Sequence, residues 1–198
     1  MKSISTFLTA AFFVMALGSC GRAPKHTGSA YTIDPGIKTK VDPKIKSVSD
    51  LLMSSMDVKI FVDDSLVADT YAEGKMLDEC MTRSSLDGDT IHISSFAGMF
   101  AGFGYQVALF GDTCIVRHFV KSDAEIYKLK KTDPPTFGIA VPCRSYKLTL
   151  VSRPTFKKGD VVEGIIELTS GEYYEVANGS ERKYKIQLTG YFKTAPLA

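Results

Sequence analysis

Residues 105–120 read YQVALFGDTCIVRHFV, and this stretch decides the fold. Two runs rich in apolar and β-branched residues, Tyr105–Phe110 and Thr113–Val120, flank the pair Gly111-Asp112. A two-residue loop with glycine first is typical of a tight β-hairpin, and such a loop sets the register of the two strands. The sequence therefore predicts an antiparallel hairpin near the middle of the chain.

This register predicts one buried face and one wetter face of the hairpin. The buried face carries three cross-strand pairs: Leu109 with Cys114, Val107 with Val116, and Tyr105 with His118. The other face carries Gln106, Ala108, Ile115 and Arg117. We expect His118 to close the apolar row beside a tyrosine, as a hydrogen-bonded histidine and candidate polar site at the edge of the core.

The stretch just before this hairpin, residues 94–105, alternates glycines with large apolar residues. One interpretation is a flexible apolar lip that meets a ligand or partner. The other, which the composition favours, is a tight bend with glycines where backbones pass closely and phenylalanines in the core. The residues that would form the lip are Phe96, Met99, Phe100, Phe103 and Tyr105.

Alternation of apolar and polar residues extends the sheet to both sides of the hairpin. Residues 58–62 and 66–71 predict a second hairpin around Asp63-Asp64-Ser65. Residues 74–89 have an irregular pattern, whereas the last third of the chain alternates as in a half-buried antiparallel sheet. We expect an all-β fold, an antiparallel β-sandwich or barrel of about nine or ten short strands. The alternation leaves open whether the sheet closes.

One short helix is expected before the strands, from Val41 to about Met56. Asp42-Pro43 matches an N-cap followed by proline at the first helical position. Apolar residues then recur at three- and four-residue spacing, at Ile45, Val48, Leu52 and Met56. We expect this helix to pack on the β domain rather than to bind a partner.

The first twenty residues have the order of a bacterial export signal. Lys2 precedes the apolar run Phe7–Leu17, which is too short for a spanning helix of about 20 residues. The run ends in Leu17-Gly18-Ser19-Cys20, which resembles the lipobox of bacterial lipoproteins, in particular envelope lipoproteins of the Bacteroidetes type. The resemblance implies that Cys20 carries fatty acyl chains, palmitate among them, and becomes the mature N-terminus. An ordinary signal peptide with an unrelated cysteine is the alternative.

The resemblance also implies a place in the cell envelope and a membrane partner through Cys20. Gly21 stands where an aspartate would resemble an inner-membrane retention signal, and no acidic run follows it. We therefore expect an outer-membrane anchor with the protein facing the periplasm, the cell surface being the alternative. The expected organisation is a signal peptide over 1–19, the lipidated cysteine and a flexible tether over 20–40, and a single β-rich domain over 41–198 that begins with the helix.

Charge and spacing exclude several classes of function. The chain has 24 Lys and Arg against 22 Asp and Glu, with no basic stripe, so we expect no binding to nucleic acid. We predict no metal and no cofactor, because Cys114 and His118 would lie about 13 Å apart along one strand. No spacing links the candidate catalytic groups, which are His92, His118, Asp112 and the cysteines, so we do not expect an enzyme.

Lipidation of Cys20 would leave Cys80, Cys114 and Cys143. Three cysteines in an oxidising compartment allow at most one disulfide and leave at least one free thiol, and the sequence does not choose the pair.

Three functions remain, from different classes. The first is a non-catalytic binding or structural module of the envelope, with a protein partner. The second is a carrier of a small apolar ligand or lipid in a cavity entered past Phe96–Tyr105. The third and least expected is an enzyme.

Overall fold

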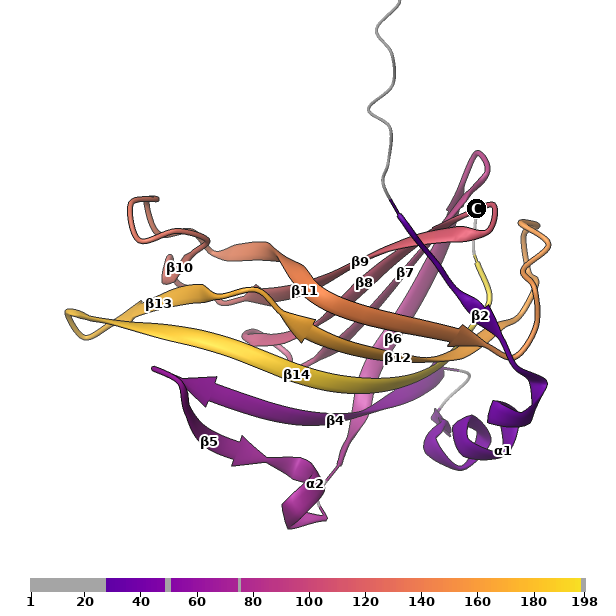
Figure 1. The fold of residues 1–198 in the computed structure, drawn as a ribbon, viewed down its shortest axis with the longest axis horizontal. Helices are drawn as coiled ribbons and strands as arrows, with labels where there is room; N and C mark the ends of the chain where they lie inside the picture. The colour runs from indigo at the N-terminus through magenta and orange to yellow at the C-terminus, as the bar shows by residue number, and fades with distance from the viewer. Residues whose placement is uncertain (1–27, 49–50, 75, 197–198) are drawn as a thin grey trace, which may run out of the picture.

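The computed structural model describes residues 28–48, 51–74 and 76–196 (Figure 1). It consists mainly of β-strands, as expected from the alternating sequence, and the all-β antiparallel fold class is confirmed. The strands are β1 Ser29–Ala30, β2 Thr32–Ile33, β3 Lys46–Val48, β4 Leu51–Val62, β5 Ser65–Asp69, β6 Leu77–Asp87, β7 Thr90–Ala97, β8 Gly102–Phe110, β9 Thr113–Lys121, β10 Tyr127–Lys128, β11 Gly138–Leu150, β12 Val162–Ser170, β13 Tyr173–Ala177 and β14 Ser180–Thr194.

Eight of these strands form a closed, barrel-like ring. Neighbouring strands pair in the order β14-β12-β11-β9-β8-β7-β6-β4, and an additional ladder between β14 and β4 joins the two ends. All of these ladders are antiparallel. In Figure 1, β11, β12, β14 and β4 form the near wall, and β7, β8 and β9 lie behind it. The closing ladder runs from Tyr184 opposite Val62 to Tyr191 opposite Ser55.

The central hairpin has the predicted register. Tyr105 lies opposite His118, Val107 opposite Val116 and Leu109 opposite Cys114. All six of these side chains are buried. Gly111 adopts a φ of +55°, which the first position of this turn requires and which glycine adopts readily.

The two ends of the ring carry different connections. The turn end carries the β4–β5 turn at 63–64 and the β7–β8 turn at 98–101. The cap end carries the β8–β9 turn at 111–112 and a short helical segment made of η1 Pro35–Ile37, α1 Lys38–Val41 and η2 Asp42–Lys44. Within the described ranges, no helix is long and apolar enough to cross a membrane.

The chain joins the sheet earlier than expected, and the predicted helix over 41–56 was wrong beyond Lys44. β1 pairs with β9, and β2 runs parallel to β11, so residues 29–33 of the expected tether are part of the sheet. β4 occupies residues 51–62 because pairing with β14 buries Met56 and Val58 on one face. Apolar residues four apart fit one face of a strand as well as one face of a helix, so the spacing was ambiguous.

The irregular pattern predicted for 74–89 was also wrong, because β6 fills most of this range. Its inward positions Cys80, Thr82 and Ser84 are small or polar, and only Leu86 near its end is a large apolar residue, so no apolar alternation marks the strand. Inside the ring, Thr82 Oγ1 donates to Ser95 Oγ at 2.9 Å, and the hydroxyls of Ser84 and Thr194 lie 2.7 Å apart. These hydrogen bonds satisfy hydroxyls that would otherwise be unfavourable to bury.

Apolar side chains fill the ring. The main cluster of buried residues comprises Met56, Val58, Cys80, Ile91, Ile93, Tyr105, Val107, Leu109, Cys114, Val116, Leu148, Leu150, Val162, Ile166, Leu168, Ile186, Leu188 and Phe192. A smaller cluster of Val120, Tyr127, Val141 and Tyr173 lies toward the turn end, with Phe103 packed against both clusters.

Candidate functional site

The β7–β8 turn is the part of the glycine-rich stretch that faces solvent. Gly98 adopts a φ of +118°, and a Cβ there would overlap with the carbonyl oxygen of Ala101. A Cβ at Gly102 would overlap with the carbonyl oxygen of Ala97. Both glycines are therefore required by close backbone approach, as the tight-bend interpretation assumed.

This turn exposes two large apolar side chains. Met99 is 80% exposed and Phe100 is 77% exposed, more than any other large apolar residue in the described part of the chain. They are adjacent in sequence and lie at the tip of the β7–β8 hairpin. We call Met99 and Phe100 the apolar turn.

A stacked pair of aromatic rings supports the base of the apolar turn on the outer surface. Phe96 stacks on Phe119 with ring centroids 5.4 Å apart, and both flank Gly104 in the cross-strand register. Lys121 Nζ lies 4.3 Å from the centroid of the Phe96 ring, within the range of a cation–π contact. Phe96 is therefore only 6% exposed, although it lies on the outer face.

The remaining two lip candidates point into the ring. Phe103 is partly buried, and its ring centroid lies 6.3 Å from that of His118. Tyr105 is fully buried and packs against Phe192 and the backbone of Gly190. Burial raises the pKa of the Tyr105 hydroxyl far above its usual value. Of the five lip candidates, the structure brings only Met99 and Phe100 together at the surface.

His118 is fully buried rather than at a wet edge. Its Nδ1 donates to the carbonyl oxygen of Gly104 at 2.9 Å, and its ring lies 5.6 Å from that of Tyr173. Burial lowers the pKa of His118 to about 4, and the bond to Gly104 acts in the opposite direction. The imidazole is therefore neutral at pH 7 and serves as a packed, hydrogen-bonded core residue.

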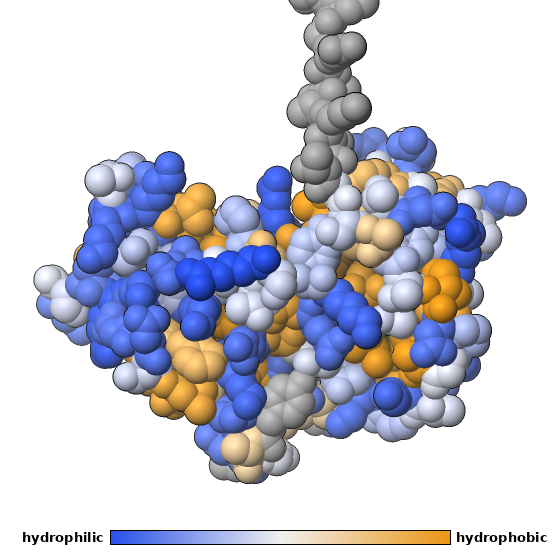
Figure 2. Space-filling model, viewed as in Figure 1, coloured by the Kyte–Doolittle hydropathy of each residue, from blue (hydrophilic) through white to orange (hydrophobic). Residues whose placement is uncertain are grey.

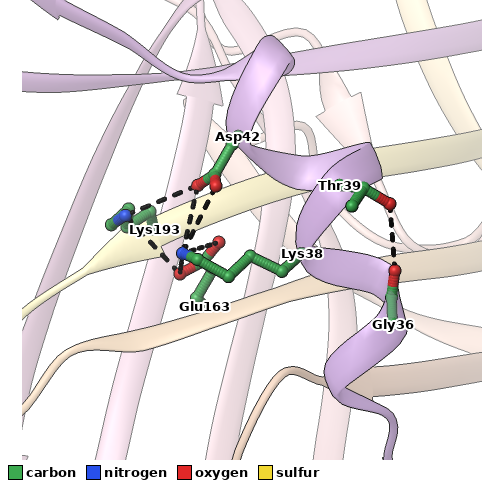
Figure 3. Close-up of polar contacts among 6 residues, drawn as sticks. All are labelled: Gly36, Lys38, Thr39, Asp42, Glu163 and Lys193. Atoms are coloured by element: carbon green, nitrogen blue, oxygen red, sulfur yellow. Dashed lines mark hydrogen bonds and ion pairs between the residues drawn. The ribbon is translucent and has the colours of Figure 1, made fainter.

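A cluster of four charged residues holds the helical segment to the cap end (Figure 3). Glu163, which is only 7% exposed, accepts from Lys38 Nζ at 3.2 Å, and Lys193 Nζ lies 3.5 Å from the same carboxylate. Asp42 pairs with both lysines, at 3.3 Å and 3.6 Å. The hydrogen bond that Lys38 donates to Glu163 raises the pKa of Lys38. Two carboxylates and two ammonium groups thus satisfy one another, which suits a structural clamp.

The cysteines and other potential ligands remain separate in the described part of the chain. No disulfide joins Cys80, Cys114 and Cys143 to one another. Burial raises the pKa values of Cys114 and Cys143 to about 11, so both thiols are protonated at neutral pH. In residues 28–48, 51–74 and 76–196, no group of three or more His, Cys, Asp or Glu side chains could hold a metal ion.

Sequence reasoning missed several residues around the apolar turn. Phe119 and Lys121 were available from the hairpin register, because the inward positions of His118 and Val120 place their neighbours outside. Phe137, which is 55% exposed, lies at the same end because Ser122 N donates to its carbonyl oxygen at 2.7 Å. This last contact is long-range and left no local signal.

Comparison with known proteins gave no relative. No protein-family model matches the chain, and no curated protein or solved structure matches it. Cys20 and the export signal lie outside the described residues.

Proposed function

We propose that this chain is a lipid-anchored, non-catalytic binding module of the bacterial cell envelope that contacts a protein partner through the apolar turn. The observation that carries the proposal is the exposure of Met99 and Phe100 on a turn held by Gly98 and Gly102. Burying such a side chain contributes about 1.5 to 3 kcal/mol. Two adjacent side chains can therefore act as the anchor of an interface.

The backbone around the apolar turn is constrained before any partner arrives. The glycine contacts fix the loop, and the Phe96–Phe119 stack packs beneath it on the outer surface. A constrained loop loses less conformational entropy on binding than a loose one. Phe96 thus supports the site from below instead of entering the interface.

The distance between the proposed lipid anchor at Cys20 and the apolar turn favours a partner on the side away from the membrane. Seven residues lie between Cys20 and Gly28, and the eight Cα–Cα steps allow at most about 28 Å of extended chain. Gly28 lies at the cap end, where a Cβ would stand 2.7 Å from the carbonyl oxygen of Cys114. The apolar turn is at the other end of the nine-residue strand β8, about 30 Å away.

The carrier alternative is less well supported. It needs Phe96 and Tyr105 at an entrance, yet both are buried. The polar groups that an enzyme would use are engaged in the fold: His118 bonds the backbone of Gly104, and the charged cluster at the cap end is paired within itself.

Site-specific photocross-linking in the native bacterium tests this proposal. A photoreactive phenylalanine replaces Phe100, and the matched control replaces His92, an exposed residue on β7 of the same hairpin. The proposal predicts one dominant protein adduct at position 100 that is absent at 92, and release from the membrane fraction by Cys20→Ala. Equal labelling at both positions, or a membrane fraction unchanged by Cys20→Ala, contradicts it.

A further inference from the structure

The sheet has an open edge along β5, at the same end of the ring as the apolar turn. β5 pairs with β4 from Val62–Ser65 to Lys59–Asp69, and β6 pairs with the same side of β4 from Met56 toward Met53. β5 and β6 therefore lie in line along one side of β4. Among the described residues, β7 covers the next position beside β6, whereas no strand pairs with the outer edge of β5.

The strand that ends at the apolar turn, β7, lies beside β6, and β5 follows further along the same side of β4. β7 pairs with β6 up to Phe96 opposite Met81 and ends at Ala97. The chain then turns back through Met99 and Phe100 into β8. Along β4, Met53 lies at the level of Phe96 and Lys59 at the level of Asp69, which are about 20 Å apart. A strand added beside β5 in line with β7 therefore reaches the apolar turn only by extending past the start of β6.

The exposed part of β5 has one of the usual protections of an edge strand, a register shift, but it carries no charge and no proline. Natural edges are commonly blunted by lysine, proline or inward charge, or by a bulge. Ser65–Ala68 contains no charged residue and no proline, and Leu66 and Val67 are 51% and 56% exposed. The register shift opposite Ile60 and Phe61 turns Val67 out of the ladder and toward solvent. Figure 2 shows apolar atoms gathered at the lower left, over the region where Figure 1 places β5.

Resting on the proposed function, we infer that the partner of the apolar turn supplies an extended polypeptide segment that adds as a strand to β5. Unpaired backbone N–H and C=O groups of an edge require another extended backbone as their complement. Apolar side chains at alternate positions of that segment contact Leu66 or Val67 and reach Met99 and Phe100.

Charge separates this occupant from a second copy of the chain. Residues 63–74 carry four carboxylates, Asp63, Asp64, Asp69 and Glu73, and no lysine or arginine. Edge-to-edge pairing of two copies would bring these carboxylates toward one another, which is unfavourable. Three of them already pair with Arg182, Lys183 and Lys59, and Glu73 is exposed at the α2 turn, Thr70–Glu73, between β5 and β6. A basic residue in the added segment complements the carboxylate of Glu73.

Amide hydrogen exchange measured by NMR tests the inference. The protein starts at Gly21, and the probe is a capped synthetic heptapeptide in which valine and threonine alternate between two terminal lysines. Millimolar peptide is expected to slow exchange at least tenfold at those amides of Ser65–Asp69 whose N–H groups point to the open edge, since the amides that point to β4 are already bonded. The same peptide with alternate amides N-methylated, or with glutamates in place of lysines, is expected to give less protection.

Two variants keep the outcome interpretable. Val67→Pro removes a backbone donor and Val67→Lys adds a guarding charge, and each is expected to abolish the protection while unfolding remains cooperative. Three results overturn the inference: no protection at β5, protection confined to another strand, or protection without peptide that grows with protein concentration and so reveals a second copy.

The proposed function and this inference fail separately. Cross-links at position 100 without protection of β5 would support the binding module and rule out strand addition. Protection of β5 without a specific adduct at position 100 would support strand addition at the β5 edge. It would rule out the apolar turn as the contact with the partner.

Discussion

The ring of Tyr105 occupies the space above Gly190, on the opposite wall of the barrel-like sheet. A Cβ at Gly190 would overlap with ring carbon Cε1 of Tyr105 and lie 2.9 Å from Cζ. The glycine on β14 and the tyrosine on β8 thus form one packing unit. This contact explains why Tyr105, a candidate for the lip, is a core residue.

Gly190→Ala is expected to destabilise the protein by about 1 to 3 kcal/mol, because overpacking forces neighbouring side chains off their preferred positions. Urea unfolding measures this, with Gln187→Ala on the exposed face of the same strand as the control. The penalty of Gly190→Ala should fall in a Tyr105→Leu background, since the overlapping ring is gone. An equal loss of stability in both backgrounds would show that the Tyr105 ring is not what disfavours a side chain at position 190.

Protonation of His118 is expected to destabilise the protein in mild acid. The folded pKa, about 4, is below the value of 6.5 for an unperturbed histidine, so the unfolded state binds the proton more tightly. The stability that comes from the neutral imidazole is complete above about pH 6.5 and is lost as the pH falls toward 4, up to about 3 kcal/mol.

Unfolding free energies of the wild type and His118→Gln between pH 4 and pH 7 test this prediction. The wild type should lose more stability than the variant over this range. Parallel pH profiles would mean that His118 does not carry the effect, and an imidazole that titrates near 6.5 by NMR would contradict its burial.

Val41 anchors the helical segment at the cap end. It is fully buried there, and the charged cluster around Glu163 holds the same segment from outside (Figure 3). Val41→Ala should cost about 1 to 3 kcal/mol and accelerate tryptic cleavage after Lys38, Lys40 and Lys44. Lys40→Ala, at an exposed neighbour, should leave stability within about 0.5 kcal/mol. Cleavage at the wild-type rate in Val41→Ala would show that the segment does not depend on this contact.

Local pattern was sufficient to predict the central hairpin. Gly111-Asp112 fixes its turn, and the period of two assigns Val107, Val116 and their partners to one face. It was insufficient for β6, whose inward positions Cys80 and Ser84 are small or polar. Ser84 is recognisable as an inward position only in the folded protein, where its hydroxyl lies beside that of Thr194 on β14.

Ring closure and the composition of the candidate site depend on long-range pairing. β4 spans residues whose spacing fits helix and strand equally, and only its ladder with β14 decides between them. Within the glycine-rich stretch, the sequence did not separate exposed Phe100 from buried Phe96. That difference comes from Phe119 and Lys121, which lie more than fifteen positions further along the chain and cover the Phe96 ring.

The measurement that tests the central claim most directly is the affinity for the protein cross-linked at position 100, for the wild type and for Met99→Ser/Phe100→Ser. Both exposed side chains can be removed with a change in unfolding free energy within about 0.5 kcal/mol, and that equality is checked first. The account predicts at least a tenfold increase in Kd for the double variant, with His92→Ser unchanged. Equal Kd values for the wild type and the double variant would contradict it.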